Sequence, residues 1–179
     1  MKKAILFTII GATIIFGWNF LSFAFPNFHR PSSTYTSAQE EILEAIEQSG
    51  LKEGMYKLGQ PGPEFAAGSE YIEAKKAYEA KPFAILNYQM EYTSSNTMSK
   101  IRLFIIDLLI ALIFFWIIRQ QKDGTLLKRV LLGVGIGFIG FLFLPYTGFI
   151  WSKEPDIWAY MLDCTVPWAL LGIVGHKLA

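Results

Sequence analysis

Two acidic residues lie inside strongly apolar stretches of the chain. Asp107 belongs to the apolar run 101–118, and Asp163 belongs to the run 157–175. A carboxylate inside a membrane helix is costly unless it is paired, protonated or hydrated. Such a residue therefore has one of two roles: it locks neighbouring helices together through hydrogen bonds, which is the more common one, or it belongs to a proton, ion or ligand site.

The depth of these acids in their runs indicates that they belong to one layer. If the runs cross a membrane as helices, each acid lies six residues from the same side, about 9 Å deep at 1.5 Å per residue. Asn19 lies six residues before the end of the first run, and Tyr146 lies at a similar distance from the end of the third. We therefore predict a polar site within the membrane, formed by Asn19, Asp107, Tyr146 and Asp163.

Two prolines lie close to this layer. Proline has no N–H, so Pro167 leaves the carbonyl of Asp163 without its helical donor, and Pro145 does the same for Phe141. The sequence thus predicts a kink in the third and in the fourth apolar run.

Four apolar runs are long enough to carry these residues across a bilayer. The chain has 179 residues, of which 53% are hydrophobic and only 17% are charged, a composition typical of membrane proteins. The runs cover residues 4–25, 101–118, 126–151 and 157–175. The first is longer than the apolar core of a signal peptide, so we expect it to be retained. The predicted fold is an all-α membrane protein with four transmembrane helices.

Residues 26–100 form the one long polar segment, between the first and second runs. A helix should begin near Thr36 or Ser37 and end at Gly50, and a second should begin at Ser69. Residues 54–58 and the alternating segment 83–92 read as strands. We predict a small α+β insert in which the apolar helix face packs on the apolar strand face; these faces are Ile42, Leu43 and Ile46, and Tyr88, Met90 and Tyr92. The domains are then 1–25, 26–100 and 101–179.

The distribution of charge predicts the orientation in the membrane. Basic residues gather in the segments that share a side with the two termini, and the only acid there is Asp123; they are Lys2, Lys3, Arg119, Lys122, Lys128, Arg129 and Lys177. By the positive-inside rule both termini are cytoplasmic and the insert is extracytoplasmic. We expect a multi-pass protein of the bacterial inner membrane.

Several other classes of site find no support in the sequence. A net charge of +1 provides no basic surface for nucleic acid. The GxGxxG pattern at 135–140 follows no strand, so close helix packing through Gly133 and Gly137 explains it better than a dinucleotide site. His29 and His176 fall on opposite sides of the membrane. We therefore assign no catalytic, cofactor or metal residue.

Features spread along the chain resemble an uncharacterised family of small bacterial four-span inner-membrane proteins. They are the aromatic end of the first span, Gly54-Met55-Tyr56 in the insert, the acidic second span, and Tyr146, Gly148, Asp163 and Trp168. The resemblance implies the four-span topology and no activity.

The function expected first is that of an accessory or interaction protein, embedded in the lipid bilayer, whose insert meets a membrane-protein partner or a second copy of the chain. The alternative is a small transport or proton-coupled protein that uses the layer of Asp107 and Asp163. A membrane enzyme comes third, because no set of nucleophile, base and ligand stands out.

Overall fold

The computed structural model describes the chain except for residues 25–27, 30–33, 63–67, 92–96, 122–123 and 154. It divides into two compact units, which we describe separately. The helical unit comprises Met1–Thr34 and Ser95–Ala179, and the insert comprises Tyr35–Ser94.

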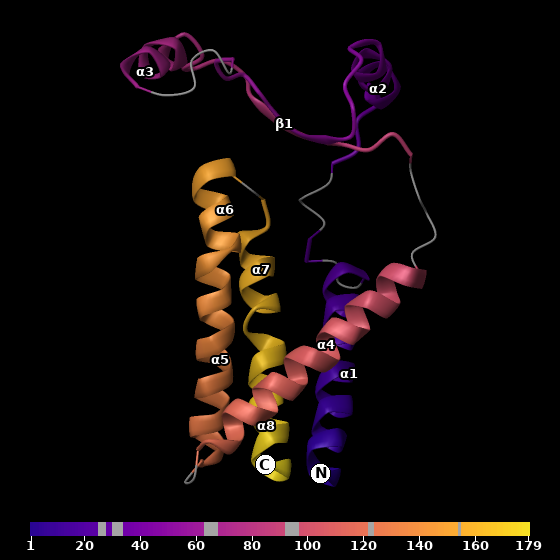
Figure 1. Ribbon diagram of the computed structural model, residues 1–179, viewed down its shortest axis with the longest axis vertical. Coiled ribbons are helices and arrows are strands. Elements are labelled where there is room, and N and C mark those ends of the chain that lie inside the picture. The colour runs from indigo at the N-terminus through magenta and orange to yellow at the C-terminus, as the bar shows by residue number, and fades with distance from the viewer. Residues whose placement is uncertain (25–27, 30–33, 63–67, 92–96, 122–123, 154) are drawn as a thin grey trace. The chain divides into compact units, whose positions relative to one another are not determined.

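The helical unit contains four helices that are long and apolar enough to cross a membrane (Figure 1). The first two are α1 (Lys2–Ala24) and α4 (Thr97–Arg119). The third consists of α5 (Leu126–Phe143) and α6 (Pro145–Ser152), and the fourth of α7 (Ile157–Asp163) and α8 (Val166–Leu178). The predicted fold class, four candidate membrane helices with a small insert between the first two, is confirmed.

The third and fourth spans are each interrupted beside a proline. Leu144 separates α5 from α6 just before Pro145, and Cys164 and Thr165 separate α7 from α8 just before Pro167. At the second break the N–H of Thr165 bonds to the carbonyl of Leu162, three residues back, which tightens the turn. These breaks follow from the missing N–H of proline, as the sequence predicted.

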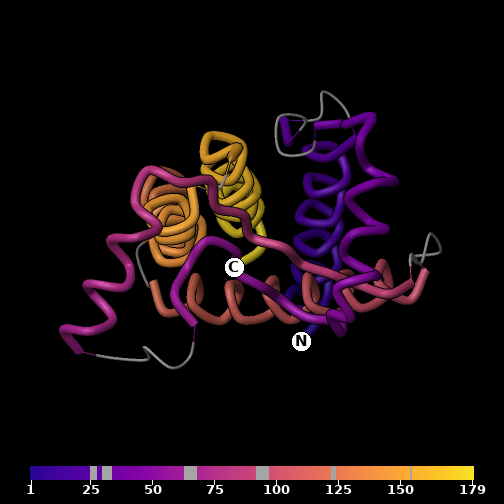
Figure 2. The backbone as a smooth tube through the Cα atoms, turned by 90° about the horizontal axis from the view of Figure 1, so that it is seen from above, coloured from indigo at the N-terminus to yellow at the C-terminus, as the bar shows by residue number. Residues whose placement is uncertain are grey.

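Small residues let the helices of this unit approach closely. A Cβ at Gly137 of α5 would collide with the carbonyl of Cys164, and one at Gly133 would collide with the carbonyl of Trp168 in α8. A Cβ at Gly11 of α1 would lie 2.9 Å from the Cβ of Ala111 in α4. The predicted packing through Gly133 and Gly137 is thus confirmed, and it pairs α5 with α8, while α4 crosses the unit obliquely beside α1 (Figures 1 and 2).

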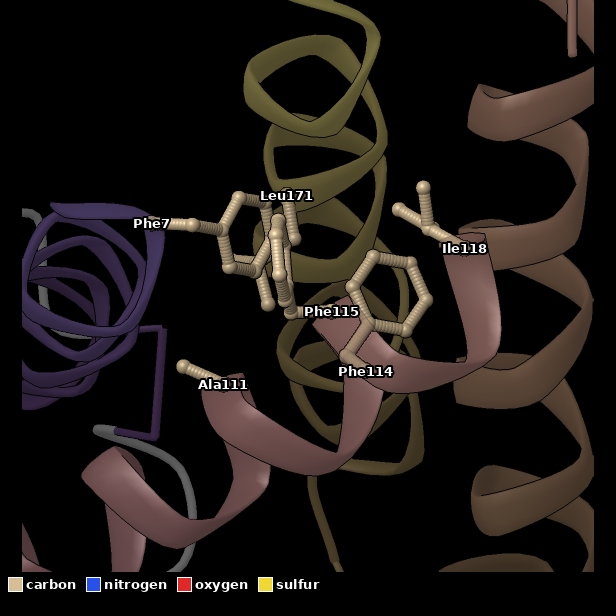
Figure 3. Packing of buried hydrophobic residues seen from close by; sticks show 6 residues of the cluster. All are labelled: Phe7, Ala111, Phe114, Phe115, Ile118 and Leu171. Atoms are coloured by element: carbon tan, nitrogen blue, oxygen red, sulfur yellow. The ribbon is translucent and has the colours of Figure 1, made fainter. Parts of the chain in front are cut away.

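A small aromatic core joins α1, α4 and α8 near the end of the unit where both termini lie (Figures 1 and 3). The rings of Phe7 and Phe115 have centroids 5.1 Å apart, and Leu171 of α8 is fully buried in the same cluster. The cluster consists of Phe7, Ala111, Phe114, Phe115, Ile118 and Leu171. Only 17–28% of each candidate span is buried, so most of its apolar surface faces outward, as a surface solvated by lipid does.

The insert contains two short helices and one antiparallel pair of strands. These are α2 (Gln39–Gln48), β1 (Gly54–Leu58), α3 (Ser69–Lys76) and β2 (Ala84–Tyr88). In the register of the strands Met55 lies opposite Asn87, and Tyr56 lies opposite Leu86. The elements therefore occur in the predicted order, and the bounds of β1 agree with the prediction.

The predicted packing between the helix face and the strand face of the insert is not found. Neither α2 nor α3 buries any residue, and Ile42 and Leu43 are 50% and 53% exposed. On the strand side Tyr88 is buried but Met90 is exposed, and Tyr92 lies outside the described residues. The sheet in the described part of the insert has only two strands of five residues each, so it offers α2 little apolar surface to pack against.

Candidate functional site

The carboxylate of Asp163, the last residue of α7, accepts hydrogen bonds from three side chains. Its Oδ1 accepts the indole N–H of Trp18 at 2.9 Å and the hydroxyl of Ser22 at 2.6 Å. Its Oδ2 lies 2.7 Å from Nε2 of His29. An ionised carboxylate only accepts, so in that state Nε2 carries the proton and donates. We call Asp163, Trp18, Ser22 and His29 the Asp163 cluster.

The imidazole of His29 is held between aromatic rings. It is 3% exposed, stacks on Phe23 with centroids 4.0 Å apart, and meets the edge of Tyr160 at 4.9 Å. Its Nδ1 faces a second carboxylate, Asp156, at 3.9 Å. An imidazolium at this position would present a donor to each of two acids.

Local structure explains how these groups converge. Trp18 and Ser22 are one helical turn apart on α1, so they lie on one face. Beyond α1, the N–H of Phe28 bonds to the carbonyl of Ser22, so that the neighbouring His29 lies close to the end of α1 and within reach of Asp163 in α7. Asp156 precedes α7 in the left-handed conformation with a φ of 65°, which Asp tolerates better than most residues.

The Asp163 cluster fixes α1 to α7. Its geometry differs from that of a hydrolytic triad, because Ser22 and His29 both bond to the acid and Ser22 does not donate to the imidazole. With three donors on one carboxylate, the charge of Asp163 is well compensated. These contacts are of the kind that holds two membrane helices in one arrangement.

Asp107 stands apart from this cluster. Its side chain is 1% exposed on α4, and its Oδ2 has no hydrogen-bond partner among the described residues. Ala111, one turn further on, shares its face and makes the close approach to Gly11 of α1. Asp107 is therefore a deeply buried acid on the tightly packed side of α4.

The structure brings together only part of the predicted polar layer. No hydrogen bond within the described parts of the chain joins Asp163 to Asp107, Asn19 or Tyr146. Asn19 is half-buried on α1, and Tyr146 is 41% exposed on α6, where its ring lies beside Phe141 and Phe149. That the four residues act as one site stays a prediction.

A second buried polar contact lies at the end of the helical unit where the two termini lie. Arg129 of α5 is 8% exposed and donates from a terminal guanidinium nitrogen to the carbonyl of Gly175 at 2.6 Å. That carbonyl belongs to the last turn of α8, where a cation is favoured by the helix dipole. The Asp163 cluster and the contact of Arg129 with Gly175 therefore stabilise the helical unit near its two ends.

Sequence reasoning missed the donors of Asp163. The polar site predicted from the sequence contains none of the four residues Trp18, Ser22, His29 and Asp156. The spacing of Trp18 and Ser22 was a usable signal, since it places two donors on one helix face. The position of His29 beside Asp163 has no comparable signal in the sequence.

These contacts define a four-span candidate membrane protein with an interhelical Asp163 cluster and a separately buried Asp107. Within the described ranges, no group of three or more His, Cys, Asp or Glu could hold a metal ion. Comparisons with models of protein families, with curated proteins and with solved structures find no match. The resemblance to a family of four-span proteins therefore stays a prediction, and function has to be argued from the chain itself.

Proposed function

We propose that this chain is a membrane-anchored interaction protein whose insert binds a partner protein. The observation that carries the proposal is the exposure of large apolar side chains throughout the insert. Met55 is 73% exposed, and Ile72 and Phe83 are each 61% exposed. The exposed group consists of Tyr35, Ile42, Leu43, Met55, Leu58, Ile72, Tyr78, Phe83, Ile85 and Met90.

The strand pair gives this surface a definite face. In this antiparallel pair Met55 lies opposite Asn87, and Lys57 lies opposite Ile85, so all four side chains point to one face, with Met55 and Ile85 diagonal to each other. Tyr56, Leu86 and the buried Tyr88 occupy the other. A pair of strands with so little core is marginal alone, and a partner that covers the face of Met55 and Ile85 would stabilise it.

The charge of the insert favours a protein over the bilayer surface as this partner. Between residues 35 and 94 there are ten Glu and five Lys. Peripheral contact with membranes relies on an excess of basic residues that attract anionic lipids, whereas in this segment acidic residues outnumber basic ones two to one. A protein surface with apolar and basic groups complements the insert on both counts.

Site-specific photocrosslinking in cells tests this function. A photoreactive amino acid at Met55 or Ile85 should give a discrete adduct with another protein, and one at the exposed Lys57, opposite Ile85 on the same face, should give the same adduct. The same amino acid at Gln48, in α2, is the control for crosslinks that arise from random collisions with other proteins. Equal labelling of all positions, or adducts with lipid or with the chain itself only, would contradict a partner protein.

The alternative function, a transport or proton-coupled protein, has one observation in its favour. Asp107 is buried with an oxygen that lacks a hydrogen-bond partner among the described residues, an arrangement that in other membrane proteins marks sites of proton or ion binding. Under this alternative Asp107→Asn should fold normally and lose activity, because the amide keeps the shape and cannot release a proton. Proton flux into proteoliposomes, compared between the wild type and Asp107→Asn, measures this; equal flux would leave only a structural role.

A further inference from the structure

A basic hollow lies at the end of the helical unit where the two termini are found. It has a volume of about 510 Å³, and Lys2, Lys3 and Arg119 contribute three cationic side chains to its lining. Phe115 and Leu178 supply apolar walls. This volume falls within the usual range of ligand pockets, about 300–1,000 Å³.

An apolar hollow adjoins it along the surface of α4. This second hollow has a volume of about 350 Å³ and is lined by Leu112, Ile113 and Trp116. The two hollows share Ala4, Phe115 and Arg119, so they lie side by side between α1 and α4. The guanidinium of Arg119 lies 6.0 Å from the centre of the Phe115 ring, which places the cation at their junction.

We propose that the two adjoining hollows bind one anionic phospholipid of the membrane, with its phosphate between Lys2, Lys3 and Arg119 and an acyl chain along Leu112, Ile113 and Trp116. Basic pockets between membrane helices suit the phosphate of a lipid headgroup. Arg119 suits it in particular, because a guanidinium can donate two parallel hydrogen bonds to a phosphate.

The apolar hollow distinguishes a lipid from a free phosphate. Leu112, Ile113 and Trp116 are exposed on the outward side of a span, where lipid tails are the solvent. A soluble phosphate would leave this surface unused. Lys2 and Lys3 begin α1, and Arg119 ends α4. Cations at span ends belong at the level of the headgroups, as does the nearby Trp116.

Native mass spectrometry of the purified protein tests the site. The probes are phosphatidylglycerol, which is anionic, and phosphatidylcholine, a zwitterion with the same acyl chains. We expect the wild type to retain phosphatidylglycerol in preference. Arg119→Gln should weaken that binding about fivefold, the effect of roughly one basic residue near an anionic lipid, and Arg119→Lys should keep most of the preference.

Lys128→Gln is the matched control, because Lys128 is an exposed cation at the start of α5, outside both hollows. It should leave binding unchanged, and an excess of glycerol phosphate should not displace the lipid. Equal retention of both lipids would overturn the proposal, as would equal losses in Lys128→Gln and Arg119→Gln. If an excess of glycerol phosphate displaced the lipid, the proposal would also be overturned, because the site would then recognise a free phosphate.

Discussion

At the scale of single residues, the hydrogen bonds to Asp163 join parts of the chain that lie more than 130 positions apart in the sequence. We expect Ser22→Ala and Trp18→Phe each to lower the free energy of unfolding by about 0.5–2 kcal/mol, because each removes one donor from the half-buried carboxylate. Unfolding in a titration of denaturing detergent measures the change.

Thr13→Ala is the control for these variants. Thr13 is exposed on the same helix and donates only to the carbonyl of Ile9, one turn back, so its loss should change stability by less than about 0.5 kcal/mol. If Ser22→Ala were as neutral as Thr13→Ala, the Asp163 cluster would not hold α1 to α7.

The sequence identifies the acids of the candidate site but not the side chains that donate to them. The two acids, Asp107 and Asp163, stand out because a carboxylate in an apolar run is rare for energetic reasons. Depth along a run, however, gives a level and not a direction around the helix axis. Asn19 has the predicted depth, but its neighbour Trp18 and Ser22, one turn further along α1, make the hydrogen bonds to Asp163.

At the scale of secondary-structure elements, two glycines of α5 determine the contact with α8. Gly137→Ala should destabilise the protein by about 1–3 kcal/mol, because the new Cβ would meet the backbone carbonyl of Cys164, which cannot rotate away as a side chain can. Gly133→Ala should act in the same way through Trp168. Thermal denaturation in a mild detergent measures both.

The same helix offers a matched control. Gly135 and Gly140 have open space where a Cβ would be placed, so Gly135→Ala should be neutral, or stabilising by up to about 1 kcal/mol through its better helix propensity. Equal losses at Gly135 and Gly137 would show that α5 and α8 do not approach as closely as described.

Elements were predicted well where local chemistry decides them. Apolar length fixed the spans, prolines fixed the breaks before α6 and α8, and glycine at 50 ended α2. The prediction that failed concerns tertiary packing. An amphipathic α2 implies that another surface covers Ile42 and Leu43, but the periodicity of the helix does not identify that surface. In the structure no element of the insert covers these two side chains, which are 50% and 53% exposed.

At the scale of the whole molecule, the insert and the helical unit should differ in local stability. Because α2 and α3 bury no residue, their amides should exchange with deuterium well before those of α1 and α8. Hydrogen exchange with mass spectrometry on the purified protein measures this order. Protection of the insert equal to that of α8 would mean that it is stable without a partner, against the proposed function.

The arrangement of the chain across the membrane gives the last prediction. Four spans put both termini on one side, and the basic residues near Lys2, Arg119 and Lys177 favour the cytoplasm for that side. The chain has one cysteine, Cys164, so Cys164→Ser gives a background for labelling. In intact cells, an impermeant maleimide should label Gln60→Cys in the insert and leave Lys177→Cys unlabelled.

Permeabilised cells provide the control, because there both cysteines should react. Each outcome has a separate physical meaning. Labelling of Lys177→Cys alone in intact cells would invert the topology, and would show that the basic residues do not set the orientation. Three spans lie between the insert and the end of α8. Labelling of both cysteines, or of neither, would place the two on the same side, so one of these three spans would lie along the membrane instead of crossing it.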